Sequence, residues 1–205
     1  MNQPGDSGTA EPFAHLLARV QACTVCAANL PHPPRPILRV SPTARLLIVG
    51  QAPGRRVHET GIPWNDPSGD LLREWLGIDR SAFYDARHIA IIPVGFCYPG
   101  KGPSGDLPPR PECAPLWHPR LRTLLARIEL TLLIGQYAQA YYLGARRRST
   151  LADTVRDYRE YLPEFFPLPH PSPRNRRWLA QHAWFESDVL PVLRRRFRAA
   201  LGAML

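Results

Sequence analysis

Four short aliphatic runs constrain the fold more than any other feature of the sequence. They read RLLIVG, HIAIIPVG, LTLLIG and EFFPLP, at residues 45–50, 88–95, 130–135 and 164–169. Such runs show little alternation of polar and apolar residues, which is typical of strands buried on both faces. Helical patterns lie between them. Strands that alternate with helices predict an α/β protein, a three-layer α/β/α fold with a central, mostly parallel four-stranded sheet.

Helical patterns occupy much of the remaining chain. We expect helices at 12–22, 68–77, 136–144 and 150–162, and one or two more within 176–203. For the second of these, Asp66 or Ser68 is the expected cap and Gly77 the expected stop. Neither a linker nor a repeat divides the sequence. We therefore predict a disordered tail over residues 1–11 and a single domain over 12–205.

The charge balance favours a polyanionic partner. Lysine and arginine number 26 against 17 acidic residues, which gives a formal net charge of +9. A surplus of this size points to nucleic acid ahead of a membrane surface as the partner. The alternative is that the surplus reflects only a GC-rich genome, in which arginine codons replace lysine codons. No apolar run reaches the roughly 18 residues of a membrane span, and the first residues lack the layout of a secretion signal. We therefore expect a cytoplasmic protein, and a monomer.

Two rigid motifs follow strand ends, where ligands bind in parallel sheets. GQAPG supplies Gln51, Ala52, Pro53 and Gly54 directly after the first run, and HPSPRN begins at His170 after the fourth. The first motif is neither a phosphate-binding P-loop nor a dinucleotide fingerprint. Its glycines let a ligand approach the backbone, and the prolines around His170 stiffen a projection that carries one imidazole. Each motif alone could be an ordinary tight turn.

A tryptophan lies in a proline-stiffened loop downstream of GQAPG. The stretch TGIPWNDPSG places Trp64 between Pro63 and Asn65. An indole on a rigid loop suits stacking on a nucleobase or another flat ligand. The alternative is a tryptophan that fills the core.

Four cysteines point to a soft-metal site. Cys23 and Cys26 form a C-x2-C pair, Cys97 and Cys113 follow, and the sequence has no others. Two structural disulfides are not expected in a cytoplasmic protein. Four thiolates suit zinc or an iron–sulfur cluster, and the spacing does not choose between them. The alternative is four unrelated reduced thiols.

The order of these motifs resembles the uracil-DNA glycosylase superfamily. The resemblance spans residues 20–200 approximately and depends on GQAPG, TGIPWNDPSG and HPSPRN in this order. It implies a DNA repair enzyme that flips uracil out of DNA and hydrolyses its N-glycosidic bond, leaving an abasic site. In such a protein Trp64 stacks on the flipped base, His170 hydrogen-bonds uracil O2, and the GQAPG loop holds the deoxyribose.

The cysteines resemble those of the iron–sulfur branch of that superfamily. That branch has an early C-x2-C pair and a later pair at about the separation seen here. The resemblance implies a [4Fe–4S] cluster held by Cys23, Cys26, Cys97 and Cys113, with a structural role. Zinc is the alternative occupant.

The resemblance also implies that the HPSPRN loop enters DNA. Ser172 and nearby amides would contact phosphates, Arg174 would fill the space that the base leaves, and Asn175 belongs to the same DNA-binding set. Extruding the base costs a few kcal/mol. A neutral His170 that donates to O2 would stabilise the departing uracil anion where its charge develops.

The group that orients the attacking water is open. The best-known branch places an aspartate in the first motif, where this sequence has Ala52. Asp66 lies close to the carboxylate that a second branch uses, and Asp106, in the loop between the later cysteines, is the other candidate. Either carboxylate could instead cap a helix or a turn.

One departure bears on which base is read. The iron–sulfur branch usually has an asparagine four residues before the third cysteine, and here that position is Pro93. Proline offers no side-chain amide to a base. Two alternatives to uracil excision follow: a glycosylase for another deaminated base such as hypoxanthine or xanthine, and a non-catalytic protein that binds the damaged base.

Overall fold

Four parallel strands form the centre of the fold. A computed structural model describes residues 11–103 and 105–202. Its main sheet contains β1 (Leu46–Val49), β2 (Ile89–Ile91), β5 (Leu130–Ile134) and β6 (Phe165–Leu168), in the order β2-β1-β5-β6, and each neighbouring pair is parallel. The predicted fold class is confirmed. Of the predicted tail, residues 1–10 lie outside the described part of the chain.

The second strand is shorter than its aliphatic run. Strand β2 ends at Ile91, whereas the sequence predicted a strand to Gly95. The reason is Pro93, which has no backbone N–H to give to a ladder. Ile92 and Val94 still donate to the carbonyls of Ile48 and Gly50, at 3.0 and 2.9 Å, so the chain stays beside β1 without continuing the strand.

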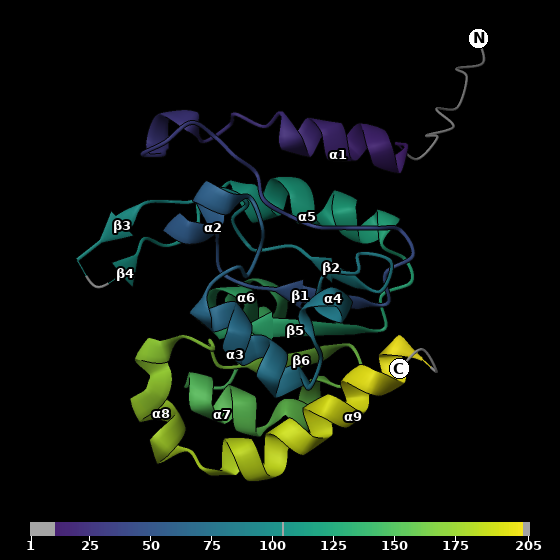
Figure 1. The fold of residues 1–205 in the computed structure, drawn as a ribbon, viewed down its shortest axis with the longest axis vertical. Coiled ribbons are helices and arrows are strands. Elements are labelled where there is room, and N and C mark those ends of the chain that lie inside the picture. Colours follow the sequence, from purple (N-terminus) through teal and green to yellow (C-terminus); the bar gives the residue numbers. More distant parts are fainter. Residues whose placement is uncertain (1–10, 104, 203–205) are drawn as a thin grey trace.

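Successive side chains of each strand point to opposite faces of the sheet and pack in two separate hydrophobic cores. On one face Leu46, Ile48 and Leu132 pack with the first set of helices and turns: α3 (Pro67–Leu76), α4 (Arg80–Phe83), α7 (Leu151–Arg156), η3 (Tyr158–Tyr161), the π-helical turn η5 (Phe185–Val189) and α9 (Leu190–Leu201). On the other face Leu47 and Leu133 pack with α1 (Phe13–Gln21), α5 (Cys113–Leu124) and α6 (Gly135–Leu143). Figure 1 shows α1 and α5 on one side of the strands, α7 and α9 on the other, and α3 in front of the strands.

Several elements differ from the sequence-based expectation. Helix α5 was not predicted, because Pro115 and Pro119 interrupt its pattern; the structure accommodates Pro119 inside the helix. No helix was predicted where α2 (Arg55–Thr60) lies, and the single helix expected at 150–162 is α7 followed by a 3-10 turn. The remaining short elements are the hairpin strands β3 (Lys101–Gly102) and β4 (Gly105–Asp106), the 3-10 turns η1 (Ala27–Asn29), η2 (Gly144–Arg146) and η4 (Pro173–Asn175), and α8 (Arg176–Gln181).

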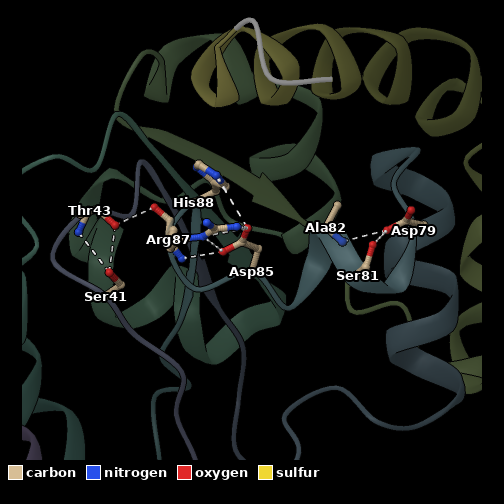
Figure 2. A network of polar contacts seen from close by, with 8 residues as sticks. All are labelled: Ser41, Thr43, Asp79, Ser81, Ala82, Asp85, Arg87 and His88. Carbon is tan, nitrogen blue, oxygen red and sulfur yellow. Dashed lines mark hydrogen bonds and ion pairs between the residues drawn. The ribbon is translucent and has the colours of Figure 1, made fainter.

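Polar contacts secure the loops at the amino ends of β1 and β2. Figure 2 shows Asp85 accepting from the Arg87 backbone N–H at 3.0 Å and from its guanidinium at 2.6 Å. The hydrogen bonds from Arg87 lower the pKa of Asp85 to about 2. Thr43 donates to the Arg87 carbonyl at 3.0 Å and so ties the loop before β1 to the turn before β2. None of the helices in the described residues is long and apolar enough to cross a membrane.

Candidate active site

A cleft opens at the carboxyl ends of the parallel strands. It consists of adjoining hollows that share Gln51, Ala52, Gly54, Asp66 and His170. All the residues that the sequence assigned to base, sugar, water or DNA contact line it: Gln51, Ala52, Pro53, Gly54, Trp64, Asp66, Asp106, His170, Ser172, Arg174 and Asn175. The structure therefore brings together three motifs that are far apart in sequence.

Trp64 and His170 face each other in the more apolar hollow. Their ring centroids are 5.6 Å apart and the ring planes are inclined by 32°. Other walls of the hollow come from Ile37, Ile91 and Pro93. Trp64 also packs against the core below it, so the core role and the cleft role coexist in one side chain. A flat apolar ligand that entered here would meet an indole and an imidazole.

Close backbone contacts determine where the indole lies. Trp64 has a φ of 56°, in the left-handed region that bulky residues rarely adopt. A β-carbon on Gly50 would lie 2.8 Å from the Trp64 ring, and one on Gly69 would lie 2.9 Å from the Trp64 β-carbon. Glycine at both positions lets the tryptophan sit between strand β1 and helix α3.

The His170 loop is held from within. The Asn175 side-chain amide donates to the His170 carbonyl at 2.8 Å, and the Ser172 hydroxyl accepts from the Arg174 backbone N–H at 3.3 Å. Gly135, with a φ of 80°, packs beneath His170. Burial lowers the pKa of His170, and nearby Asp66 opposes this shift. The imidazole is therefore neutral at pH 7 and can donate a hydrogen bond without carrying a charge.

The two candidate carboxylates have different environments. Asp66 is the N-cap of α3: its Oδ1 accepts from the Gly69 N–H at 2.8 Å, which is the capping alternative foreseen from sequence. Asp106, on β4, has Oδ2 3.1 Å from the point where a Gly54 β-carbon would lie. Asp106 thus approaches the GQAPG loop at its last glycine, and Asp66 lines the same hollows as that loop.

Charges around Asp106 act in opposite directions. Desolvation raises its pKa, Arg174 and Lys101 lower it, and Asp66 raises it. The Arg174 guanidinium lies against Gly105, so that a side chain at Gly105 would collide with it. Arg174 thus connects the HPSPRN loop with the β3–β4 hairpin across the cleft.

Pro93 lines the cleft and has no polar side-chain group to offer a ligand there. Its carbonyl lies 3.0 Å from Nε2 of buried His118, whose Nδ1 lies 2.8 Å from the Tyr142 hydroxyl. Burial lowers the pKa of His118 to about 4, so the ring is neutral and uses one N–H for the Pro93 carbonyl. The position of His118 behind the cleft wall carries no sequence signal, because its contact with Pro93 joins residues 25 positions apart.

The four cysteines lie near one another, and none of them is among the described residues that line the cleft. All are free thiols. Burial raises the pKa of Cys113 to about 12 and that of Cys97 to about 11, and Cys23 and Cys26 add to both shifts by charge repulsion. The Phe96 N–H donates to the Cys113 sulfur at 3.3 Å. The gathering of four thiols suits a soft-metal centre, because a bound metal ion deprotonates the thiols that coordinate it. As the side chains stand, the described residues include no group of three or more ligands arranged to hold a metal ion.

The chain resembles known proteins both in sequence and in structure. The sequence model of the uracil DNA glycosylase superfamily matches residues 39–194 of this chain. Among solved structures, the chain is similar to the solution NMR structure of a candidate uracil DNA glycosylase from Methanosarcina acetivorans. The TM-score is 0.46 and the sequence identity 18%, over 78% of this chain and 94% of that chain.

Proposed function

Because this chain belongs to the uracil DNA glycosylase superfamily, we propose that it excises uracil from DNA by hydrolysing the N-glycosidic bond and leaves an abasic site. Family membership supports a DNA glycosylase. The observation that carries the proposal is the pairing of Trp64 and His170, 5.6 Å apart in one cleft. An aromatic face and a rigid neutral donor are what a flipped base requires.

His170 would stabilise the leaving group. As the glycosidic bond breaks, negative charge spreads over the departing base, and a donor already aimed at its oxygen lowers the barrier. Asn175 fixes the backbone of His170, and burial keeps the ring neutral. Trp64 would hold the base by stacking, with Gly50 and Gly69 setting the position of the indole.

Asp106 would orient the attacking water. Ala52 provides no carboxylate in the first motif, and one oxygen of Asp66 is already engaged by the Gly69 N–H. Asp106 lies beside Gly54, next to the loop that would hold the deoxyribose. The bond that breaks joins C1′ to the base nitrogen; water supplies the hydroxyl at C1′ and its proton passes to the carboxylate.

The wall at Pro93 favours a second candidate substrate class. With its carbonyl taken by His118, Pro93 offers the base an apolar surface where the iron–sulfur branch usually has an amide. An apolar wall discriminates weakly between bases of similar shape. Excision of another deaminated base, hypoxanthine or xanthine, is therefore the alternative within the same enzyme class.

A [4Fe–4S] cluster on Cys23, Cys26, Cys97 and Cys113 completes the proposal. The donor set fits, since four thiols gather where backbone N–H groups reach sulfur. Bound there, the cluster would anchor both ends of the segment that carries Asp106. Purified protein should show the visible absorption of an iron–sulfur cluster and contain iron. If the purified protein contains one equivalent of zinc instead of iron, the cluster assignment is refuted and the glycosylase assignment stands.

One assay tests the reaction and the base. Oligonucleotides that contain uracil, hypoxanthine or xanthine are incubated with the protein and then treated with alkali, which breaks abasic strands. Breaks confined to uracil support the proposal, and breaks at another base move the assignment to the alternative. Tight binding without breaks identifies a non-catalytic damage-binding protein. His170→Ala should lower turnover by about 100-fold; an unchanged rate contradicts its role.

A further inference from the structure

The loop that carries Trp64 is held by a second layer of side chains behind the cleft. The Tyr84 hydroxyl donates to the Pro63 carbonyl at 2.8 Å, and Arg80 donates to the Asn65 side chain at 2.7 Å. A third contact comes from α3, where the Arg73 guanidinium donates to the Trp64 carbonyl at 3.4 Å. We propose that Arg73 is a positioning residue, which holds Trp64 in the conformation that stacks on the extruded base.

Arg73 is unusual because its charge is buried. Arg73 is 7% exposed, and it is not one of the described residues that line the cleft. Its guanidinium pairs with Asp70 at 2.5 Å and lies over the rings of Phe83 and Tyr84, 5.2 and 5.8 Å from their centroids. Burying a cation is unfavourable unless its donors are used. The Trp64 carbonyl is therefore one of the acceptors that its burial requires.

The left-handed backbone conformation of Trp64 in turn needs stabilising contacts from neighbouring residues. A left-handed φ of 56° on a bulky residue is strained, and such strain persists only where neighbouring groups over-determine it. The carbonyl that Arg73 contacts lies directly against Gly69 in the first turn of α3. Without Arg73 this carbonyl loses its charged donor, and the loop can relax toward ordinary φ values. Rotation at Trp64 would move the indole out of contact with Gly50 and His170.

Binding of a DNA analogue separates positioning from general stability. The probe is an oligonucleotide with 2′-fluoro-2′-deoxyuridine, which resists hydrolysis. We expect Arg73→Met to weaken binding about tenfold, the size of one hydrogen bond from a charged group, while Arg73→Lys retains part of the affinity. Arg194→Met is the matched control, because Arg194 donates to the carbonyls of Trp75 and Glu74 at the other end of the same helix.

A double-mutant cycle decides whether Arg73 acts through Trp64. Trp64→Ala should weaken binding about tenfold or more by loss of stacking, and Arg73→Met should add nothing in that background. Additive effects of the two changes, or equal losses in Arg73→Met and the Arg194→Met control, overturn the inference.

The inference rests on the proposed stacking role of Trp64, and the two can fail separately. Unchanged binding in Trp64→Ala refutes the stacking role and the inference with it. Weakened binding in Trp64→Ala beside unchanged binding in Arg73→Met refutes only the role of Arg73. If Arg73→Met does not fold, Arg73→Lys is measured in its place. A folded Arg73→Lys variant with unchanged kcat and raised KM supports the inference. A folded variant in which kcat and KM are both unchanged contradicts the inference.

Discussion

Replacing Gly69 by alanine tests the packing of the tryptophan loop, because two physical effects predict opposite signs. Gly69 is the third residue of α3, and alanine in place of a helical glycine normally stabilises a protein by about 1 kcal/mol. Here the added methyl would lie 2.7 Å from the Trp64 carbonyl carbon and closer still to its oxygen. These are backbone atoms, which cannot rotate away. The loop must move instead.

The expected loss follows from the contacts that such a movement breaks. A shift of the loop disrupts the hydrogen bond from Arg73 to the Trp64 carbonyl and that from Tyr84 to the Pro63 carbonyl, each with a net contribution of about 1 kcal/mol. Overpacking adds about 1–3 kcal/mol. Against the gain of about 1 kcal/mol in helix propensity, we expect Gly69→Ala to destabilise the protein by about 2–4 kcal/mol. That corresponds to a fall in Tm of about 4–16 °C for a chain of this size.

Two measurements check this prediction. Thermal unfolding followed by circular dichroism gives the change in Tm, and binding of the 2′-fluoro-2′-deoxyuridine oligonucleotide reports whether the indole has moved. Glu74→Ala, on the exposed face of the same helix, should leave both within error. A Gly69→Ala protein as stable as the wild type, with undiminished DNA binding, would refute the reasoning about the loop.

Three further predictions concern ionisable and cysteine residues. Above about pH 4, Asp85→Asn should be less stable than the wild type by about 1 kcal/mol. Because the folded state lowers the pKa of Asp85 to about 2, this difference in stability should vanish as the pH falls through that value. Urea unfolding between about pH 2 and 7 measures the difference. Asp106→Asn should lower kcat by about 100-fold or more, and a full rate in this variant contradicts the role of Asp106 in orienting water. Because desolvation raises the pKa of Asp106, the kcat/KM of the wild type should fall as the pH drops through a pKa above the usual aspartate value. Cys113→Ser should lose iron and lower Tm together, measured by elemental analysis and thermal unfolding; unchanged iron content would remove Cys113 from the ligand set.

Much of the site could be predicted because its signals are local. GQAPG and HPSPRN each follow a buried strand, and the carboxyl ends of parallel strands meet at one edge of the sheet. The structure places both motifs there, with Trp64 between them. Cap and stop signals around α3 were equally local, and Asp66 and Gly77 occupy the expected positions.

Other features could not be predicted, because they depend on contacts between distant segments. Helix α5 forms despite Pro119 because Trp117 and Leu121 bury against α1 and the sheet, which outweighs the local preference. The contacts of Arg73 and His118 with the backbone around the cleft join residues 9 and 25 positions apart. A pattern read along one segment carries no information on which partner such a side chain will meet.

The sequence by itself determined the class of fold, the edge of the sheet that carries the cleft and the residue types gathered there, since these follow from periodicity and strand order. Only the tertiary structure decided that Asp106 approaches the GQAPG loop at Gly54, and why Gly50 and Gly69 must lack side chains. The physical reason is distance: close approach and burial of charge are decided within about 3 or 4 Å, and only folding sets which atoms come that close.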